Sequence, residues 1–192
     1  MLNLAVLISG SGSNLQALID ACKDPAFPAR IQLVISNRSD AYGLKRAEEA
    51  GIPAHVVDHS DFDGRAAFEN ALSEKLAEYP VGLICLAGFM RILTADFVSQ
   101  WPNKIINTHP SLLPKFGGEG MYGEHVHKAV LEAGEETSGC SIHYVIPEVD
   151  QGEVIVQKTV PVEKGDTPET LAHRVIAQEH IAYPEAVRII AG

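Results

Sequence analysis

The sequence has no excess of positive charge. Its 192 residues include 15 Lys and Arg against 25 Asp and Glu, which gives a formal net charge of −10 at pH 7. Nucleic acids and anionic membrane surfaces are bound by basic faces, so we expect neither as the main partner. A small anionic ligand held by backbone N–H groups in a local pocket is compatible with this charge.

Cysteine is scarce, and long apolar runs are absent. The three cysteines, Cys22, Cys85 and Cys140, are widely separated and have no metal-ligand spacing, which indicates a reducing compartment. No run approaches the roughly 20 apolar residues of a membrane helix. The N-terminus also has no charged segment followed by a cleavage site. These features predict a soluble, cytoplasmic protein, and they leave its oligomeric state open.

The chain does have enough apolar residues for a substantial core, since 46% of it is hydrophobic. Short apolar runs with little polar alternation are typical of strands buried on both faces, as in a parallel sheet. Their alternation with helical segments predicts an α/β fold with an open, doubly wound, mostly parallel sheet. The expected strands are 2–8, 31–36, 54–57, 81–86 and 103–107, and the expected helices are 14–23, 41–50, 64–79 and 94–99.

The pattern changes after residue 115. A glycine-rich connection leads to an expected helix at 124–133, strands at 139–146 and 153–161, and a long helix from 168. Asp166 and Glu169 have the spacing of a capping box around Pro168, and Pro184 should kink or end the helix. We predict a single domain over 1–192, with halves at about 1–102 and 103–192 and a ligand cleft at the carboxyl ends of the strands.

The stretch ISGSGSNLQ follows the first expected strand and opens the first helix. Gly10 and Gly12 allow a tight turn, and Ser13 and Asn14 add polar groups beside the free N–H groups of the helix N-terminus. Leu15 stands where a dinucleotide fingerprint has its third glycine, and the second strand ends without a ribose-binding acid. The loop therefore favours a lone phosphate over NAD, although a plain strand-to-helix turn uses glycine in the same way.

The stretch NTHPSLLPK lies at the expected end of the fifth strand, where open α/β sheets bind ligands. Asn107 and His109 point to the same side of an extended chain, so they can converge on one oxygen atom. Histidine transfers protons near neutral pH, and an amide donates to a developing oxyanion. Pro110 and Pro114 restrict the loop that follows. A lone histidine at a strand end is also a common surface or core residue.

Other candidate residues have ordinary alternatives. Asp150 would favour a charged His109 if the two were close, but most Asp-x-Gly sequences are simple turns. His125, His127 and His143 lack the spacing of a zinc site, so we expect no metal.

The segment Gly88–Leu93 combines apolar residues with Arg91. It would suit a flat heteroaromatic ring with an acidic tail, although a helix-entry turn looks similar. Arg65, like Arg91, is isolated in an acidic chain and has a solvated side chain as its alternative.

Four motifs, ISGSGSNLQAL, LAGFMRIL, INTHPSLLPKF and DQGEVIVQ, together resemble the phosphoribosylglycinamide formyltransferase family over essentially the whole chain. The resemblance implies the formyltransferase fold with a Rossmann-like N-terminal half, and a role in de novo purine synthesis. It implies two small-molecule substrates, phosphoribosyl glycinamide and 10-formyltetrahydrofolate. On this basis we expect 1–102 to be the half with the phosphate loop and 103–192 to be the catalytic and folate-binding half. It also implies a cis peptide at Leu113–Pro114.

The resemblance further implies roles for matching positions. The catalytic residues are Asn107, His109 and Asp150; the substrate-binding residues are Gly12, Ser13, Asn14 and Glu179; the folate-binding residues are Arg65, Met90, Arg91, Ile92, Leu93 and Asn107. The family reaction is attack of the glycinamide amine on the formyl carbon through a tetrahedral oxyanion. The chain departs from the family pattern at Phe116–Glu124, a longer and more glycine-rich stretch.

Three other functions are the alternatives. Methionyl-tRNA formyltransferase is expected to have an additional domain and a basic surface, which do not match this length and charge. Formyltetrahydrofolate deformylase usually has a regulatory domain ahead of the catalytic one, whereas the first expected strand begins here at residue 2. A non-catalytic nucleotide-binding module would use the glycine loop only.

Overall fold

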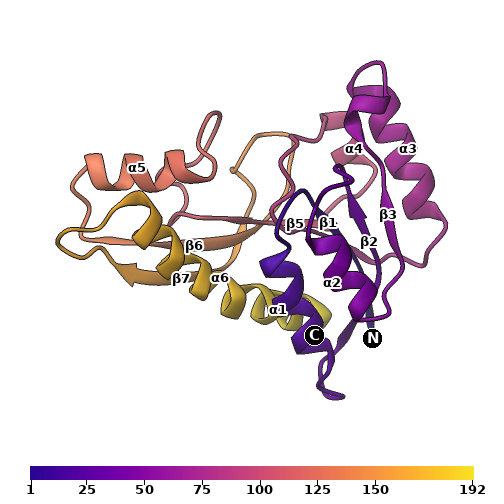
Figure 1. Ribbon diagram of the computed structural model, residues 1–192, viewed down its shortest axis with the longest axis horizontal. Helices are drawn as coiled ribbons and strands as arrows, with labels where there is room; N and C mark the ends of the chain where they lie inside the picture. The colour runs from indigo at the N-terminus through magenta and orange to yellow at the C-terminus, as the bar shows by residue number, and fades with distance from the viewer.

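The computed structural model describes residues 1–192 and contains one continuous seven-stranded sheet with the strand order β3-β2-β1-β4-β5-β6-β7 (Figure 1). Strands β1 to β5 are parallel to one another, whereas β6 and β7 pair antiparallel at one edge. This arrangement confirms the predicted open, mostly parallel α/β sheet. The strands are β1 Leu2–Ile8, β2 Ala29–Ser36, β3 Ala54–Val56, β4 Leu83–Leu86, β5 Ile105–His109, β6 Thr137–Tyr144 and β7 Val154–Pro161.

Helices cover both faces of this sheet, and each face has its own apolar core. One core includes buried side chains of α1, α2, α5 and α6, and the other includes those of α3 and α4. This explains the apolar runs of β1, β2 and β4, whose buried side chains alternate between the two cores. The helices are α1 Ser13–Cys22, α2 Gly43–Glu49, α3 Arg65–Ala77, α4 Ala95–Ser99, α5 Glu124–Glu132 and α6 Pro168–Ala191, with a short 3-10 turn η1 at His59–Asp61. No helix is both long and apolar enough to span a membrane.

The start of α6 differs from the predicted capping box. The box is formed by Thr167 and Thr170: the Thr167 hydroxyl accepts the Thr170 N–H, and Thr170 accepts the Thr167 N–H. Asp166 instead accepts two hydrogen bonds from the Arg174 guanidinium, at 2.8 and 3.0 Å. The prediction was wrong by one residue because threonine caps as well as aspartate, and the ion pair with Arg174 uses both carboxylate oxygens.

This ion pair gives a pH-dependent contribution to stability. The Arg174 guanidinium holds the pKa of Asp166 well below its usual range. Because the folded-state pKa is depressed, the stabilisation is present above the unfolded value of about 3.9 and is lost as the pH falls toward the folded value. Asp166→Asn is therefore expected to lower the melting temperature at pH 7, with a difference from the parent protein that shrinks below about pH 4. Thermal unfolding followed by circular dichroism between pH 7 and 3 measures this.

Asp63 is the matched control, because it is an exposed carboxylate outside every ion pair. Asp63→Asn should leave the melting temperature almost unchanged at pH 7. A constant difference between the Asp166 variant and the parent protein across the acidic range would contradict the assigned ion pair.

Pro184 does not end α6, which continues to Ala191. The expectation rested on the missing N–H and the steric effect of the ring. On either side of Pro184, however, α6 buries Tyr183 and Ala186 completely. The Tyr183 hydroxyl also donates to the Leu86 carbonyl at 2.9 Å, at the end of β4. Burial of this face stabilises the helix on both sides of Pro184.

Strand β5 extends two residues further than predicted, to His109. Asn107, Thr108 and His109 all pair with the antiparallel strand β6, with Asn107 opposite His143 and His109 opposite Ser141. The expectation that His109 lies just past a strand was therefore wrong, because β6 supplies the hydrogen-bonding partners that prolong the ladder. Asn107 and His109 nevertheless lie on one face of β5, as the alternation of side chains requires.

Candidate active site

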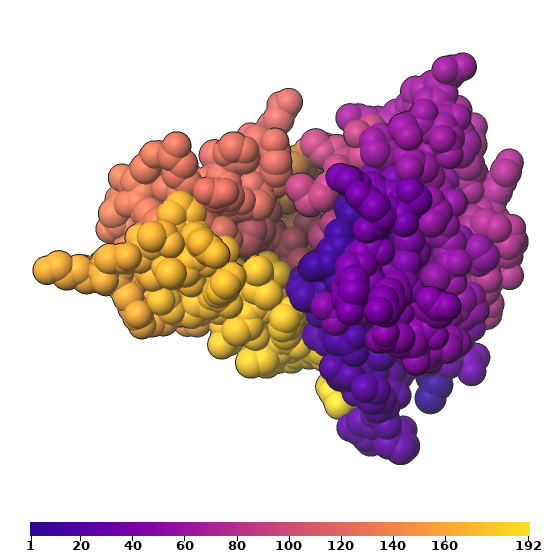
Figure 2. Space-filling view, viewed as in Figure 1, coloured from indigo at the N-terminus to yellow at the C-terminus, as the bar shows by residue number.

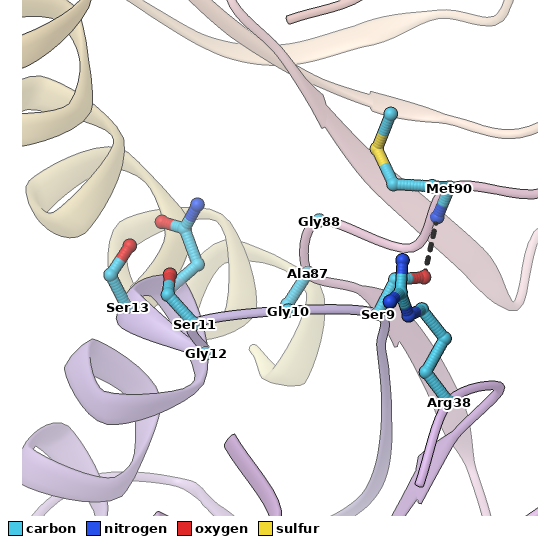
Figure 3. A pocket seen from close by; sticks show the side chains of 10 residues that line it. Ser9, Gly10, Ser11, Gly12, Ser13, Arg38, Ala87, Gly88 and Met90 are labelled. Atoms are coloured by element: carbon cyan, nitrogen blue, oxygen red, sulfur yellow. Dashed lines mark hydrogen bonds between the residues drawn. The ribbon is translucent and has the colours of Figure 1, made fainter. Parts of the chain in front are cut away.

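The glycine loop after β1 lines a pocket at the carboxyl ends of the central strands (Figure 3). The pocket has a volume of about 300 Å³ and lies at the switch point of the sheet, where β1 has β2 on one side and β4 on the other. Figure 3 shows Ser13 and Arg38 toward opposite ends of this pocket. Its lining residues are Ser9, Gly10, Ser11, Gly12, Ser13, Asn14, Arg38, Ala87, Gly88 and Met90.

Close packing explains Gly12. This residue has φ +70° and precedes α1, and a Cβ atom placed on it would lie 2.6 Å from the Cα of Gly43 at the start of α2. Gly43 also donates its N–H to the Gly10 carbonyl at 3.0 Å. A side chain at position 12 would therefore push α2 away from the loop. No side chain caps the N-terminus of α1, so its first N–H groups remain available to an anion.

Asn14 and Glu179 meet beneath this loop although they are far apart in the sequence. The Asn14 amide donates to a Glu179 carboxylate oxygen at 2.8 Å, and both side chains are buried. The Asn14 Oδ1 atom is buried without a partner. Burial raises the pKa of Glu179, and the hydrogen bond from Asn14 opposes this shift. The structure thus brings together two of the predicted substrate-binding residues.

Arg38 is a residue of this pocket that sequence reasoning did not single out. It lies two residues beyond the end of β2, and its guanidinium makes two hydrogen bonds of 2.9 Å to Asp40. A basic residue just past the second strand of a doubly wound sheet was the available signal, because such strand ends converge on the ligand cleft. Arg38 thus places a guanidinium group, paired with Asp40, at one end of the pocket.

The three predicted catalytic residues form the second part of the site. His109 is 3% exposed, and its Nδ1 atom lies 3.4 Å from Oδ2 of Asp150. Its other nitrogen, Nε2, makes a 2.8 Å hydrogen bond with the carbonyl of Phe116. Both ring nitrogens thus face oxygen atoms that can accept hydrogen bonds. Asp150 does approach His109, as the catalytic hypothesis requires.

His143 joins this cluster, although the sequence presented it only as part of a rejected zinc site. Its Nε2 atom lies 3.7 Å from Oδ1 of Asp150 and 3.4 Å from the Asn107 amide nitrogen. Burial lowers the pKa of His143, and the Tyr144 carbonyl and Asp150 offset this only in part. Pairing of Asn107 with His143 across β5 and β6 brings these two side chains into contact.

No group of three or more His, Cys, Asp or Glu side chains has the arrangement of a metal site.

The glycine-rich stretch after β5 packs against Asp150. The Gly118 N–H donates to Oδ2 of Asp150 at 3.0 Å, and a Cβ on Gly117 would lie 3.3 Å from the Asp150 Cβ. Asp150 itself has φ +57°, a left-handed conformation that is uncommon outside glycine, asparagine and aspartate. The Leu113–Pro114 peptide bond is cis, as the family resemblance implied. The departure at Phe116–Glu124 therefore lies directly beside the catalytic candidates.

A second hollow, of about 480 Å³, includes Asp150 in its wall. In the space-filling view, the surface is hollowed between the N-terminal half and the region around α5 (Figure 2). The lining residues of this hollow are Leu113, Pro114, Gly117, Gly118, Val149, Asp150, Gln151, Gly152 and Val154.

The predicted folate-binding residues are only partly brought together. Met90 lines the glycine-loop pocket and is 55% exposed, whereas Leu93 is buried in the core beside α3 and α4. Arg91 and Ile92 lie between them in the same irregular segment. Arg65 begins α3, is exposed and lines neither hollow.

The class of protein is indicated by three features together: a doubly wound sheet, a glycine loop, and an Asn-His-Asp cluster at the strand ends. The formyl transferase family model matches residues 2–187, and the chain belongs to this family.

Within the family, the chain is similar to phosphoribosylglycinamide formyltransferases. It is 46% identical to the Escherichia coli phosphoribosylglycinamide formyltransferase over 95% of this chain and 84% of that protein. It superimposes with a TM-score of 0.94 on the glycinamide ribonucleotide transformylase 1 of Symbiobacterium toebii, at 47% identity and covering 100% of this chain and 88% of that one. It is also 51% identical to the chicken trifunctional purine biosynthetic protein adenosine-3, over 98% of this chain, but spans only 18% of that relative's length.

Proposed function

We propose that this protein transfers the formyl group of 10-formyltetrahydrofolate to the amine of phosphoribosyl glycinamide in purine synthesis. The observation that carries the proposal is the position of Asp150, within 3.4 Å of His109 and beside the Asn107–His143 pair. A carboxylate, an imidazole and an amide at one strand end are the groups needed for acyl transfer through an oxyanion. The names of the relatives agree with this activity.

The residues would divide the chemistry as follows. Asn107 donates a hydrogen bond to the oxygen that becomes negative when the amine attacks the formyl carbon. His109 donates a second hydrogen bond or delivers a proton, and Asp150 keeps its ring charged and oriented. The amine gives up one proton after it has added to the formyl carbon, and the folate nitrogen takes up one proton as its bond to that carbon breaks, so no net proton is consumed. Holding both substrates together supplies much of the acceleration.

The glycine loop would hold the phosphate of the substrate. The uncapped N–H groups at the start of α1 and the Ser13 side chain in the pocket wall support this role. The segment 88–93 would form the folate side of the cleft, since Ala87, Gly88 and Met90 line the same pocket.

Turnover of the purified protein with glycinamide ribonucleotide and 10-formyltetrahydrofolate tests the proposal. Formylated glycinamide ribonucleotide should accumulate in equal amount with tetrahydrofolate. Release of formate without the amine acceptor would indicate a formyltetrahydrofolate deformylase. Transfer of the formyl group to methionyl-tRNA would indicate a methionyl-tRNA formyltransferase. Binding of the phosphoribosyl compound but not of the folate would indicate a non-catalytic nucleotide-binding module.

Replacement of Ser13 or Asn14 by alanine tests the phosphate position. Each change is expected to raise the KM for the phosphorylated substrate about tenfold or more, because a hydrogen bond to a charged group contributes about 1.5–3 kcal/mol. Steady-state kinetics with the folate at saturation measures the change. Ser73→Ala on α3, across the sheet from α1, is the control. An unchanged KM in both loop variants would place the phosphate elsewhere.

A further inference from the structure

A row of buried polar groups joins the end of β2 to the segment 88–93 without involving the Asn-His-Asp cluster. Asn37 directly follows β2 and is 2% exposed, and its Oδ1 accepts a hydrogen bond from the Ser9 hydroxyl at 2.5 Å. The Ser9 oxygen in turn accepts the Met90 backbone N–H at 2.8 Å (dashed line in Figure 3). On its other side, Nδ2 of Asn37 faces Nδ1 of His59 at 3.2 Å.

The far end of the same segment has a separate anchor. Glu69 on α3 is 5% exposed and accepts hydrogen bonds from the Thr94 backbone N–H, at 2.7 Å, and from the Thr94 hydroxyl. Between these two anchors the segment 88–93 forms neither helix nor strand. Phe89 and Leu93 are buried in the apolar core, and the two side-chain anchors, rather than the sheet ladder, supply the hydrogen bonds that fix the segment relative to the glycine loop.

The glycine loop has anchors of its own that do not involve Asn37. The Gly10 carbonyl accepts the Gly43 N–H at 3.0 Å, and the Ser11 carbonyl accepts from Nε of Arg46 at 2.8 Å. Loss of the Asn37 amide should consequently release the wall that contains Met90 while the phosphate-binding loop stays in place.

We propose that Asn37 is a positioning residue for the folate side of the cleft. It does not line the pocket, and it acts through Ser9 by orienting the hydroxyl that receives the Met90 N–H. Without its acceptor, the Ser9 hydroxyl has no fixed orientation, and its oxygen no longer presents a fixed lone pair to the Met90 N–H. The inference rests on the proposed function, in which the segment 88–93 contacts 10-formyltetrahydrofolate.

Steady-state kinetics of Asn37→Ala tests this role. The KM for 10-formyltetrahydrofolate is expected to rise about tenfold, since a buried polar group is left unpaired. The KM for phosphoribosyl glycinamide and the kcat should each stay within about twofold, because the Asn37 side chain bonds to Ser9 and His59 and to no residue of the first turn of α1 or of the catalytic cluster. Asn37→Asp keeps an acceptor oxygen and should recover most of the affinity for the folate.

Ser36→Ala is the matched structural control. Ser36 is fully buried next to Asn37, but its hydroxyl donates to the Arg38 carbonyl at 2.7 Å and takes no part in the row. This variant should leave the KM for the folate within about twofold. A Ser9→Ala change should raise that KM like Asn37→Ala, and the double variant should show little further increase because both residues act through one contact. If Asn37→Ala does not fold, Ser9→Ala and its folate-selective effect carry the test.

Three results would overturn the inference: equal increases in both KM values, an equal effect of Ser36→Ala, or an Asn37→Asp variant as impaired as Asn37→Ala. The activity of the parent protein distinguishes failure of this inference from failure of the proposed function. If the parent does not transfer the formyl group, the proposed function fails and the inference falls with it. If the parent is active and the variants keep its KM for the folate, the inference alone fails.

Discussion

Replacing His109 with alanine is expected to lower the turnover of formyl transfer at least about a hundredfold, the lower end of what a general acid or base contributes. The imidazole lies between the Asp150 carboxylate and the Phe116 carbonyl, with both ring nitrogens engaged. Alanine removes the imidazole that would handle the proton and leaves Asp150 without its ring partner. Single-turnover kinetics measures the chemical step apart from substrate binding.

A loss of fold must be distinguished from a loss of chemistry, because His109 is buried. His109→Gln retains an amide donor of comparable length and should preserve more of the packing while remaining inactive. His125→Ala, at an exposed histidine on α5, is the control for histidine removal and should be fully active. Near-normal turnover of a folded His109 variant would show that another group handles the proton.

Replacing Asp150 with asparagine is expected to have an effect of similar size, about a hundredfold or more in turnover. The change removes the charge that faces Nδ1 of His109 and Nε2 of His143, at 3.4 and 3.7 Å. An amide can still accept the Gly118 N–H that now bonds to Oδ2. The loss should therefore appear in kcat rather than in the KM of either substrate.

The backbone at Asp150 determines which substitution is informative. With φ +57°, this position suits asparagine, whereas alanine is strained there by about 1–2 kcal/mol. Asp150→Ala is expected to lower the melting temperature as well as the activity, and Asp150→Asn mainly the activity. Thermal unfolding of both variants, measured beside kcat, separates the two effects. An Asp150→Asn variant with near-normal kcat would remove Asp150 from the mechanism.

Features encoded within one segment could be predicted. The apolar runs marked all seven strands. Two helix ends likewise have local causes: the Thr94 side chain accepts the Phe97 N–H at the start of α4, and Gly51, with φ +69°, follows α2. The predicted ends of strands and helices differed from the structure where a neighbouring element supplied the stabilising contact. Pairing with β6 prolonged β5, and burial carried α6 past Pro184.

Contacts between distant segments could not be predicted without the motif resemblance. Asn14 and Glu179, or His109 and Asp150, meet only when α6 and the loop before β7 pack beside the strand ends. His143 was missed because its role depends on the register of an antiparallel pair that the sequence does not reveal.

Three features follow from the linear chain, because they depend on local geometry and side-chain periodicity. They are the order of strands and helices, the glycine loop between β1 and α1, and the position of Asn107 and His109 on one side of β5. The partners of these groups were decided by the folded sheet. Asp150 reaches His109, Asn37 orients Ser9, and Arg38 completes the pocket because the strand ends converge at one edge. Such contacts depend on how whole elements pack, and no pattern along the chain specifies the distance between side chains of different elements.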